Sequence, residues 1–409
     1  MVKVADLSIS SSDLSAICAK VRFGNSSEDE IDYFSSIAWS VICEPGDAFA
    51  GQLISTFGAA RALSLELART AAARYVSLFA QAGSDWAEMQ KFGRFERTLA
   101  DARERWSPRF SMAKVASAVN TIAALGGWFV TETSEFWPNA LLDLENHAPR
   151  GLWGIGTPNF DIGRAISVVG SRVSTAYGEY ATGELVGPMA SRGFSIISGG
   201  AYGIDAQAHR ATLALGGKTI AVMAGGLDRL YPSGNRELFN EIASKGLLLS
   251  EMPPGAEPTK WRFLQRNRLI AALGQAIILV EANARSGAVS TANRGVDLGR
   301  PIGAVPGPIN APGSDGCHQL IRGQKAELIT CADDILELLG ENSTTMPAEV
   351  SGLGALETRV LDVIGLTGAD FNRIRSEGGL TAAEAEIGIA GLSLLGYIER
   401  DSSGWRRSL

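Results

Sequence analysis

The sequence predicts an α/β protein built around a doubly wound, mostly parallel sheet, with a helical domain before it and a small winged-helix-like domain after it. Apolar residues make up 45% of the 409 positions, and the 47 glycines suit a globular protein with many tight loops. Between residues 165 and 307, short runs that are apolar on both faces alternate with helical stretches. A buried parallel sheet with one crossover helix between successive strands produces this pattern.

Six runs are the predicted strands of this extended Rossmann-like domain: AISVVG (165–170), FSIISG (194–199), TIAVMAG (219–225), LLLSEM (247–252), AIILVEA (276–282) and PIGAVPG (301–307). Ligands of doubly wound sheets bind at the carboxyl ends of the strands. The loops that follow these runs are therefore the first place to look for a functional site.

The flanking regions follow other patterns. Residues 1–150 are helical and rich in alanine, typical of a helix-hairpin or SAM-like domain, and 46–63 predicts two short helices around a glycine turn. The sheet domain takes residues 151–340, and a breaker-rich linker follows at 341–352. Residues 353–409 predict three helices and a hairpin, the outline of a winged helix.

Charge is distributed unevenly along the chain. The total is −7, but residues 164–327 hold 17 Lys and Arg against 12 Asp and Glu, a net of +5 that leaves −12 for the rest. A basic domain in an acidic protein indicates a polyanionic ligand. No apolar run approaches the ~20 residues of a membrane span, and the N-terminus does not resemble a signal peptide. We therefore expect a cytoplasmic protein with reduced cysteines and, from the scattered Cys and His positions, no metal site.

The stretch KWRFLQRNRLIA (260–271) concentrates four cations and two aromatics without one acid. Single-stranded nucleic acid binds where cations follow the phosphates and aromatic faces stack on bases. The alternative is an amphipathic helix with core aromatics and solvated cations. This stretch alone favours the alternative.

Two glycine-containing loops follow the first two strands, GSRVSTAYG (170–178) and SGGAYGIDAQAHR (198–210). Gly199, Gly200 and Gly203 let the backbone approach a ligand, and a helix beginning near Ile204 would direct N–H groups at an anion. The glycines could equally serve only to tighten turns. The first loop lacks GxGxxG, which disfavours NAD, and LGGKT (215–219) lacks the features of an ATP-binding loop.

Some residues suggest acid–base chemistry. Glu251 and Glu281 end the fourth and fifth predicted strands, and Asp205 and His209 lie four residues apart on one helix. A structural role for these groups is favoured: Asp205 complements a helix N-terminus, and the glutamates orient nearby groups. We therefore predict no catalytic residue and no cofactor.

Taken together, seven motifs in register resemble the bacterial DNA-processing A (DprA/Smf) family. They are GSR with a following YG, SGGAYGIDAQAH, KTIAVMAGGLDRLYP, SEMPPG, RNRLIAAL, VEANARSGAVSTA and GRPIGAVPGP. The resemblance implies a cytosolic, non-enzymatic homodimer that binds single-stranded DNA and loads the RecA recombinase onto it, as in natural transformation. The edge around the fifth and sixth predicted strands is a candidate dimer interface.

Loop position and this resemblance together give the predicted DNA-binding residues: Gly170, Ser171, Arg172, Ser198, Gly199, Gly200, Gly203, Lys260, Phe263, Arg266, Asn267, Arg268, Ser286, Gly287 and Thr291. The winged unit is a poor DNA reader, because its third helix carries Glu384 and Glu386 and no cation. One alternative function is a nucleotide-processing N-glycosidic hydrolase of related fold. The other is a nucleotide-sensing or scaffold protein.

Overall fold

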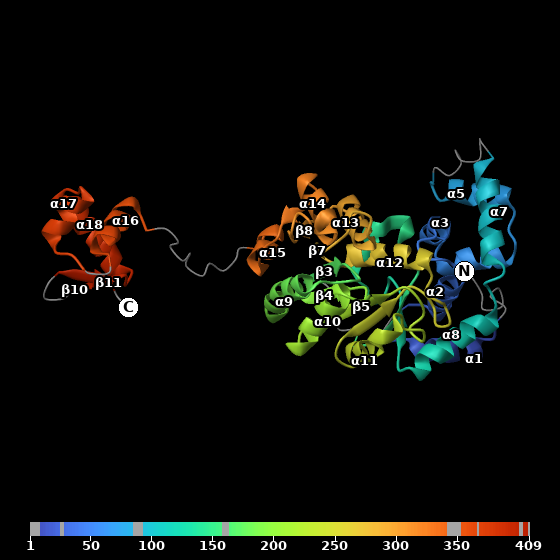
Figure 1. The fold of residues 1–409 in the computed structure, drawn as a ribbon. Coiled ribbons are helices and arrows are strands. Elements are labelled where there is room, and N and C mark those ends of the chain that lie inside the picture. The colour runs from blue at the N-terminus through green and yellow to red at the C-terminus, as the bar shows by residue number, and fades with distance from the viewer. Residues whose placement is uncertain are drawn as a thin grey trace. The chain divides into compact units, whose positions relative to one another are not determined.

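The computed structural model describes residues 9–24, 28–84, 93–157, 163–341, 353–365, 368–400 and 404–407. The chain divides into two compact units, Met1–Glu341 and Asn342–Leu409 (Figure 1). Except for Glu341, the predicted linker 341–352 lies outside the described residues. Among the residues described, no helix is long and apolar enough to cross a bilayer.

The first part of the larger unit is helical, as predicted. Its helices are α1 (Ser11–Val21), α2 (Glu30–Ile42), α3 (Ala48–Phe57), α4 (Ala59–Leu67), α5 (Ala72–Gln81), α7 (Arg94–Trp106) and α8 (Met112–Ala124). The glycine turn between α3 and α4 is confirmed: Gly58 has φ 80°. Asp47 starts α3 by accepting hydrogen bonds from the amides of Phe49 and Ala50. The core of these helices is continuous with side chains of the sheet and of α11 (Arg236–Lys245), including Phe239.

The sheet has nine strands in the order β1-β2-β6-β5-β4-β3-β7-β8-β9. The six predicted strands are confirmed as β3 (Ala165–Gly170), β4 (Ser195–Ser198), β5 (Thr219–Met223), β6 (Leu247–Ser250), β7 (Ala276–Val280) and β8 (Ile302–Ala304). They pair in parallel throughout. The hairpin β1 (Trp128–Val130) and β2 (Leu152–Gly156) extends one side of the sheet in antiparallel fashion, and the two-residue strand β9 (Glu327–Leu328) pairs beyond β8.

Helices cover both faces of this sheet. Alternate residues of β3 separate the two sides: Ile166 and Val168 pack with α9 (Ala176–Ser191), α10 (Ile204–Ala214) and α15 (Ala332–Leu338). Ala165 and Val169 pack instead with α12 (Lys260–Leu273), α13 (Gly287–Asp297) and α14 (Asp315–Arg322). The doubly wound prediction is therefore confirmed, and α10 and α12 reach the same carboxyl end of the sheet from opposite faces. The described residues of this unit also contain the 3-10 helices η2 (Asn139–His147), η3 (Ser233–Asn235) and η4 (Pro312–Ser314).

The smaller unit contains α16 (Ala355–Ile364), α17 (Phe371–Gly378), α18 (Ala382–Leu394) and the hairpin β10 (Ile398–Arg400)–β11 (Trp405–Arg407). Three helices and a hairpin thus occur in the predicted order around a small core of its own. Thr381 and Glu384 form a reciprocal capping box at the start of α18. Glu384, one of the two acids that argue against DNA binding by α18, therefore stabilises the start of this helix.

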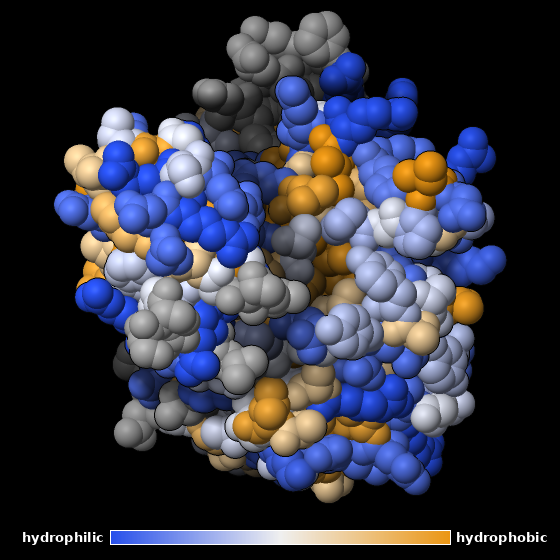
Figure 2. Space-filling model, turned by 60° about the vertical axis from the view of Figure 1, so that its left-hand side comes forward, coloured by the Kyte–Doolittle hydropathy of each residue, from blue (hydrophilic) through white to orange (hydrophobic). Residues whose placement is uncertain are grey.

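The face of the molecule in Figure 2 is mostly hydrophilic, with hydrophobic residues gathered in a few patches. Several large apolar side chains are nevertheless exposed in the larger unit. Among them, Tyr202, Tyr231 and Trp261 are 46%, 50% and 57% exposed, respectively. Tyr202 follows β4, Tyr231 follows β5, and Trp261 lies in the first turn of α12. All three therefore lie towards the carboxyl edge of the sheet, where ligands of this fold bind.

Candidate nucleic-acid interface

The loops after β3 and β4 touch each other at the carboxyl end of the sheet. The amide of Ile204, the first residue of α10, donates a hydrogen bond to the carbonyl of Ser171 at 3.1 Å. A Cβ atom at Gly203 would lie 2.2 Å from that carbonyl, and Gly203 has φ 75°. A Cβ at Gly170 would lie 1.9 Å from the carbonyl of Val280. Glycine is therefore required at both positions, and the N-terminus of α10 is held beside the loop that carries Arg172.

Arg266 of α12 lies against the glycine loop. A Cβ at Gly199 would lie 1.5 Å from Arg266 Nη1, so only glycine leaves room for this guanidinium. Arg266 is 5% exposed, and its Nε and Nη1 have no hydrogen-bond partner in the part of the chain that the structure describes. Burial lowers the pKa of Arg266 to about 10, although the nearby Asp205 opposes that change. A buried cation with unused donors is costly unless an anion joins it.

Asp205 holds the same loop from within. Its Oδ2 accepts hydrogen bonds from the amides of Gly199 at 3.2 Å and Ala201 at 3.3 Å. Burial raises the pKa of this carboxyl, and Arg266 and the two amides act against the rise. The backbone of residues 199–203 and the N-terminus of α10 form the candidate phosphate cradle, and two of its amides, those of Gly199 and Ala201, already make hydrogen bonds. Those of Gly200 and Gly203 make no hydrogen bond within the described residues.

Phe263 connects the cradle to the surface. The guanidinium carbons of Arg172 and Arg266 lie 5.4 Å and 5.7 Å from the centre of its ring. Lys260 is exposed and stands one helical turn before Phe263, on the same side of α12. The structure therefore brings Phe263, Arg266 and Lys260 of α12 to the same side of the sheet as Arg172 from the loop after β3.

Tyr202 and Tyr231 also lie at the candidate site, and the sequence did not single them out. The ring of Tyr231 meets that of Phe263 edge to face, with centroids 5.6 Å apart. The hydroxyl of Tyr202 accepts a hydrogen bond from the amide of Gly234 at 3.3 Å, which joins the loops after β4 and β5. The sequence feature that could have identified them is an aromatic residue in the loop directly after a buried strand, in AYG for Tyr202 and in LYP for Tyr231.

A second predicted group gathers where α12 meets α13. Asn267 Nδ2 and Thr291 Oγ1 both donate to the carbonyl of Gly287 at 3.2 Å. The hydroxyl of Ser286 caps α13 by accepting from the amide of Val289. These hydrogen bonds hold the start of α13 against α12 at Asn267, the neighbour of Arg266 in the sequence.

Two predicted DNA-binding residues are engaged elsewhere. Arg268 is 4% exposed and its Nη2 donates to Oε1 of Glu251 at 2.6 Å. It lines a separate cavity of about 780 Å³ together with Trp261 and Gln265. The hydroxyl of Ser198 donates to the carbonyl of Val168 at 2.7 Å, inside the sheet. Both side chains therefore serve the fold through these hydrogen bonds.

The candidate acid–base residues have structural partners. Burial lowers the pKa of His209 to about 3, and its Nδ1 contacts the hydroxyl of Thr219 at 2.7 Å, so the ring is neutral at pH 7. Glu281, at φ 49°, accepts hydrogen bonds from the amide of Thr175 at 2.9 Å and from the hydroxyl of the same residue. Glu281 thereby holds the segment that carries Arg172, and Glu251 holds Arg268.

Comparisons with known proteins identify relatives of this chain. The profile of the family described as DNA recombination-mediator protein A matches residues 128–340. A Mycobacterium tuberculosis protein assigned as DNA processing protein DprA is 39% identical over 317 residues, 73% of this chain and 81% of its own length. The DNA processing protein DprA of Bacillus subtilis is 36% identical over 237 residues, 58% of this chain and 76% of its own. The crystal structure of DNA processing protein A from Streptococcus pneumoniae superposes with a TM-score of 0.57 at 29% identity, covering 75% of this chain and 97% of that one.

Proposed function

This chain belongs to the DNA recombination-mediator protein A family, and from that premise we propose that it binds single-stranded DNA at Phe263 and the glycine loops and passes the strand to a RecA-type recombinase. The strand would serve recombination, including DNA uptake in natural transformation. The protein performs no chemistry on the DNA.

The observation that carries the proposal is the buried guanidinium of Arg266, with its unused Nε and Nη1 beside Gly199. A phosphate diester is a suitable partner, because arginine forms paired hydrogen bonds with phosphate oxygens. The N-terminus of α10 and the exposed cations Arg172 and Lys260 favour the same ligand. A chain of phosphates is favoured over a single one because these charges lie both inside the cradle and outside it.

Half-buried Phe263 and the exposed Tyr202 and Tyr231 indicate which polyanion binds. Phe263, Tyr231 and Tyr202 surround the cradle, and aromatic rings contribute about 1–3 kcal/mol for each base that stacks on them. Bases in a duplex are already stacked and paired, whereas those of a single strand are free to stack on protein. We therefore propose that single-stranded DNA is preferred over duplex.

The hydrolase alternative needs a carboxylate or imidazole free to move a proton. Asp205, Glu251 and Glu281 each accept hydrogen bonds that hold a loop or an arginine in place. The low pKa of His209 follows from burial within the fold. These contacts favour a binding protein over an enzyme.

The remaining parts of the proposal concern the modules and partners. Residues 1–150 form the SAM-like domain and 151–340 the DNA-binding domain, and 341–352 link them to a winged-helix-like module at 353–409. That module acts as a packing or protein-contact unit, because Arg406 on its hairpin pairs with Glu399 at 2.7 Å. The protein works as a homodimer and contacts RecA, as the resemblance to the family implies.

Fluorescence anisotropy with a labelled dT oligonucleotide, a duplex of equal length and a salt series tests the proposal. We expect preference for the single strand, a steep loss of affinity with salt, and loss of binding in Arg172→Ala and in Lys260→Ala/Phe263→Ala. Equal binding of the duplex, or undiminished binding by these variants, would remove the site assignment. Analytical ultracentrifugation and RecA filament formation on protein-coated single strands would test the homodimer and RecA loading.

A further inference from the structure

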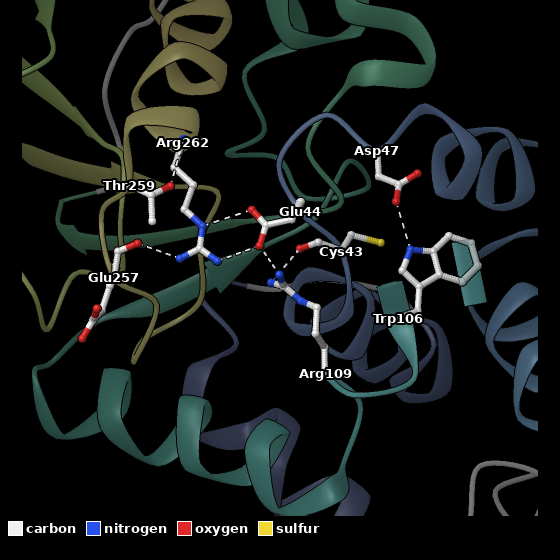
Figure 3. A network of polar contacts seen from close by, with 8 residues as sticks. All are labelled: Cys43, Glu44, Asp47, Trp106, Arg109, Glu257, Thr259 and Arg262. Carbon is white, nitrogen blue, oxygen red and sulfur yellow. Dashed lines mark hydrogen bonds and ion pairs between the residues drawn. The ribbon is translucent and has the colours of Figure 1, made fainter. Parts of the chain in front are cut away.

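The loop 43–47, between α2 and α3, contacts the first turn of α12 through Glu44 and Arg262, which are 218 positions apart in the sequence (Figure 3). Oε2 of Glu44 accepts from Nε of Arg262 at 3.0 Å, and Oε1 accepts from Nη2 at 2.6 Å. Arg109 donates to the same carboxylate, and its Nη2 donates to the carbonyl of Cys43 at 3.2 Å. One acid of the N-terminal region thus joins α12 to the segment after α7.

Arg262 is fixed from more than one direction. Its Nη1 donates to the carbonyl of Glu257 at 2.6 Å, and its amide donates to the capping hydroxyl of Thr259. The Arg262 side chain is 14% exposed, and that of Glu44 is 35% exposed. Burial opposes ionisation of Glu44, but hydrogen bonds from Arg262 and Arg109 outweigh it and lower the pKa. The cation at 262 is therefore committed to this pair and is turned away from solvent.

A second contact holds the same helix one and a half turns later. Arg268 donates to Glu251 at 2.6 Å, and Glu251 also accepts from the amide of Gly46 at 3.2 Å. Gly46 has φ 72°, and a Cβ there would lie 3.1 Å from Arg268 Nε. The loop that carries Glu44 therefore contacts α12 at two levels.

The residues that contact the cradle lie on the same helix. Phe263 follows Arg262 directly, and Arg266 is one turn further. We propose that Glu44 is a positioning residue for DNA binding: by holding Arg262, it fixes α12 so that Phe263 and Arg266 meet Arg172. This role rests on the proposed function. It makes Arg262 an anchor of the helix instead of a ligand of the phosphates.

An electrostatic role and a positioning role of Glu44 predict opposite changes in DNA affinity when Glu44 is removed. An acid near a polyanion site repels the ligand, so its removal by electrostatics alone would leave binding unchanged or tighter. Positioning predicts weaker binding, by about two- to thirtyfold, the range found for residues that act through a contiguous network. The salt slope should stay the same, since every phosphate keeps its cation, whereas removal of a phosphate ligand lowers the slope by about 0.7.

The experiment compares the full-length protein with Glu44→Ala, Glu44→Gln, Arg262→Ala and Glu44→Ala/Arg262→Ala in dT anisotropy across salt. We expect weaker binding with an unchanged slope in all four, a smaller loss for Glu44→Gln, and a double variant no worse than the worse single variant. Glu66→Ala is the matched control. Glu66 pairs with Arg103 at 2.8 Å inside the helical region, so its loss should leave DNA affinity unchanged.

Hydrogen exchange without DNA separates this inference from the function on which it rests. The amides of residues 263–266 should exchange faster in Glu44→Ala than in the wild type, and Glu66→Ala should not affect them. Wild-type protein that binds dT, with Glu44→Ala and Glu44→Gln binding equally or more tightly, would overturn the positioning role. If the wild type fails to bind dT, the proposed function is wrong, and unchanged exchange in Glu44→Ala would then show that the anchor is wrong as well.

Discussion

Replacement of Gly199 by alanine tests the cradle most directly. The new Cβ would lie 1.5 Å from Nη1 and 2.5 Å from Cζ of Arg266, and distances below 3.4 Å are already tight. The guanidinium must therefore withdraw by about 1.9 Å, the difference between 3.4 Å and 1.5 Å. A hydrogen bond to a phosphate oxygen does not survive such a displacement.

The loss of affinity can be estimated from that displacement. A hydrogen bond to a charged group contributes about 1.5–3 kcal/mol, so single-stranded DNA should bind about one to two orders of magnitude more weakly. Gly199 does not have positive φ, so alanine fits the backbone there and the fold should persist. Anisotropy with the dT oligonucleotide, together with a thermal melt, measures both effects.

Gly183→Ala is the matched control. Gly183 lies within α9, and a Cβ there would meet no atom within 4 Å. Alanine in a helix is favoured over glycine by up to about 1 kcal/mol, so this variant should bind DNA normally and melt no lower than the wild type. A folded Gly199→Ala protein that binds DNA within threefold of the wild type would refute the role of Arg266.

Three further outcomes follow from the interactions described. Phe263→Ala should weaken DNA binding by about five- to 150-fold, the equivalent of 1–3 kcal/mol of stacking, and Tyr231→Ala should weaken it by less. Anisotropy with dT and with an abasic oligonucleotide would separate base stacking from backbone binding. Equal losses of affinity for the two oligonucleotides would contradict stacking. Arg172→Ala should reduce the slope of DNA affinity against salt concentration by about 0.7 for each phosphate that it no longer neutralises. Arg268→Ala should instead lower the melting temperature and leave that slope unchanged, because Arg268 pairs with Glu251. A reduced slope for Arg268→Ala would show that Arg268 contacts the DNA. The pKa of His209 is lowered to about 3 in the fold, so between that pH and about 6.5 the unfolded chain binds a proton that the folded chain does not, and the free energy of unfolding falls by about 1.4 kcal/mol for each unit that the pH falls. In urea unfolding at pH 7 and pH 5, His209→Gln should therefore lose about 2 kcal/mol less than the wild type. Equal losses in the two proteins would contradict a neutral His209.

The positions of the six parallel strands were largely predictable, because buried parallel strands are continuous apolar runs and β3 to β8 have that form. The hairpin of β1 and β2 was not. Its strands are short, and Trp128 and Trp153 lie on opposite faces of the sheet, so no single periodicity identifies them. Antiparallel pairing to β6 then depends on the register of a segment almost 100 residues away.

The basic run 260–268 illustrates the limit for the site. Four cations in nine residues have four different environments: Lys260 is exposed, Arg262 pairs with Glu44, Arg266 is buried beside Gly199, and Arg268 pairs with Glu251. The sequence locates the run but not these partners, since two of them lie on distant segments. Helical phase separates the faces of α12, but it does not tell which face meets a carboxylate.

The ring of Phe263 with its two neighbouring guanidiniums has a consequence for ligand choice. A base that reaches the ring must share it with Arg172 and Arg266, and both cations gain a new partner only if a phosphate arrives at the same time. A free nucleoside supplies the base alone, and inorganic phosphate supplies only the anion. The proposed site would therefore discriminate against a free nucleoside and against inorganic phosphate, because each supplies only one of the two groups.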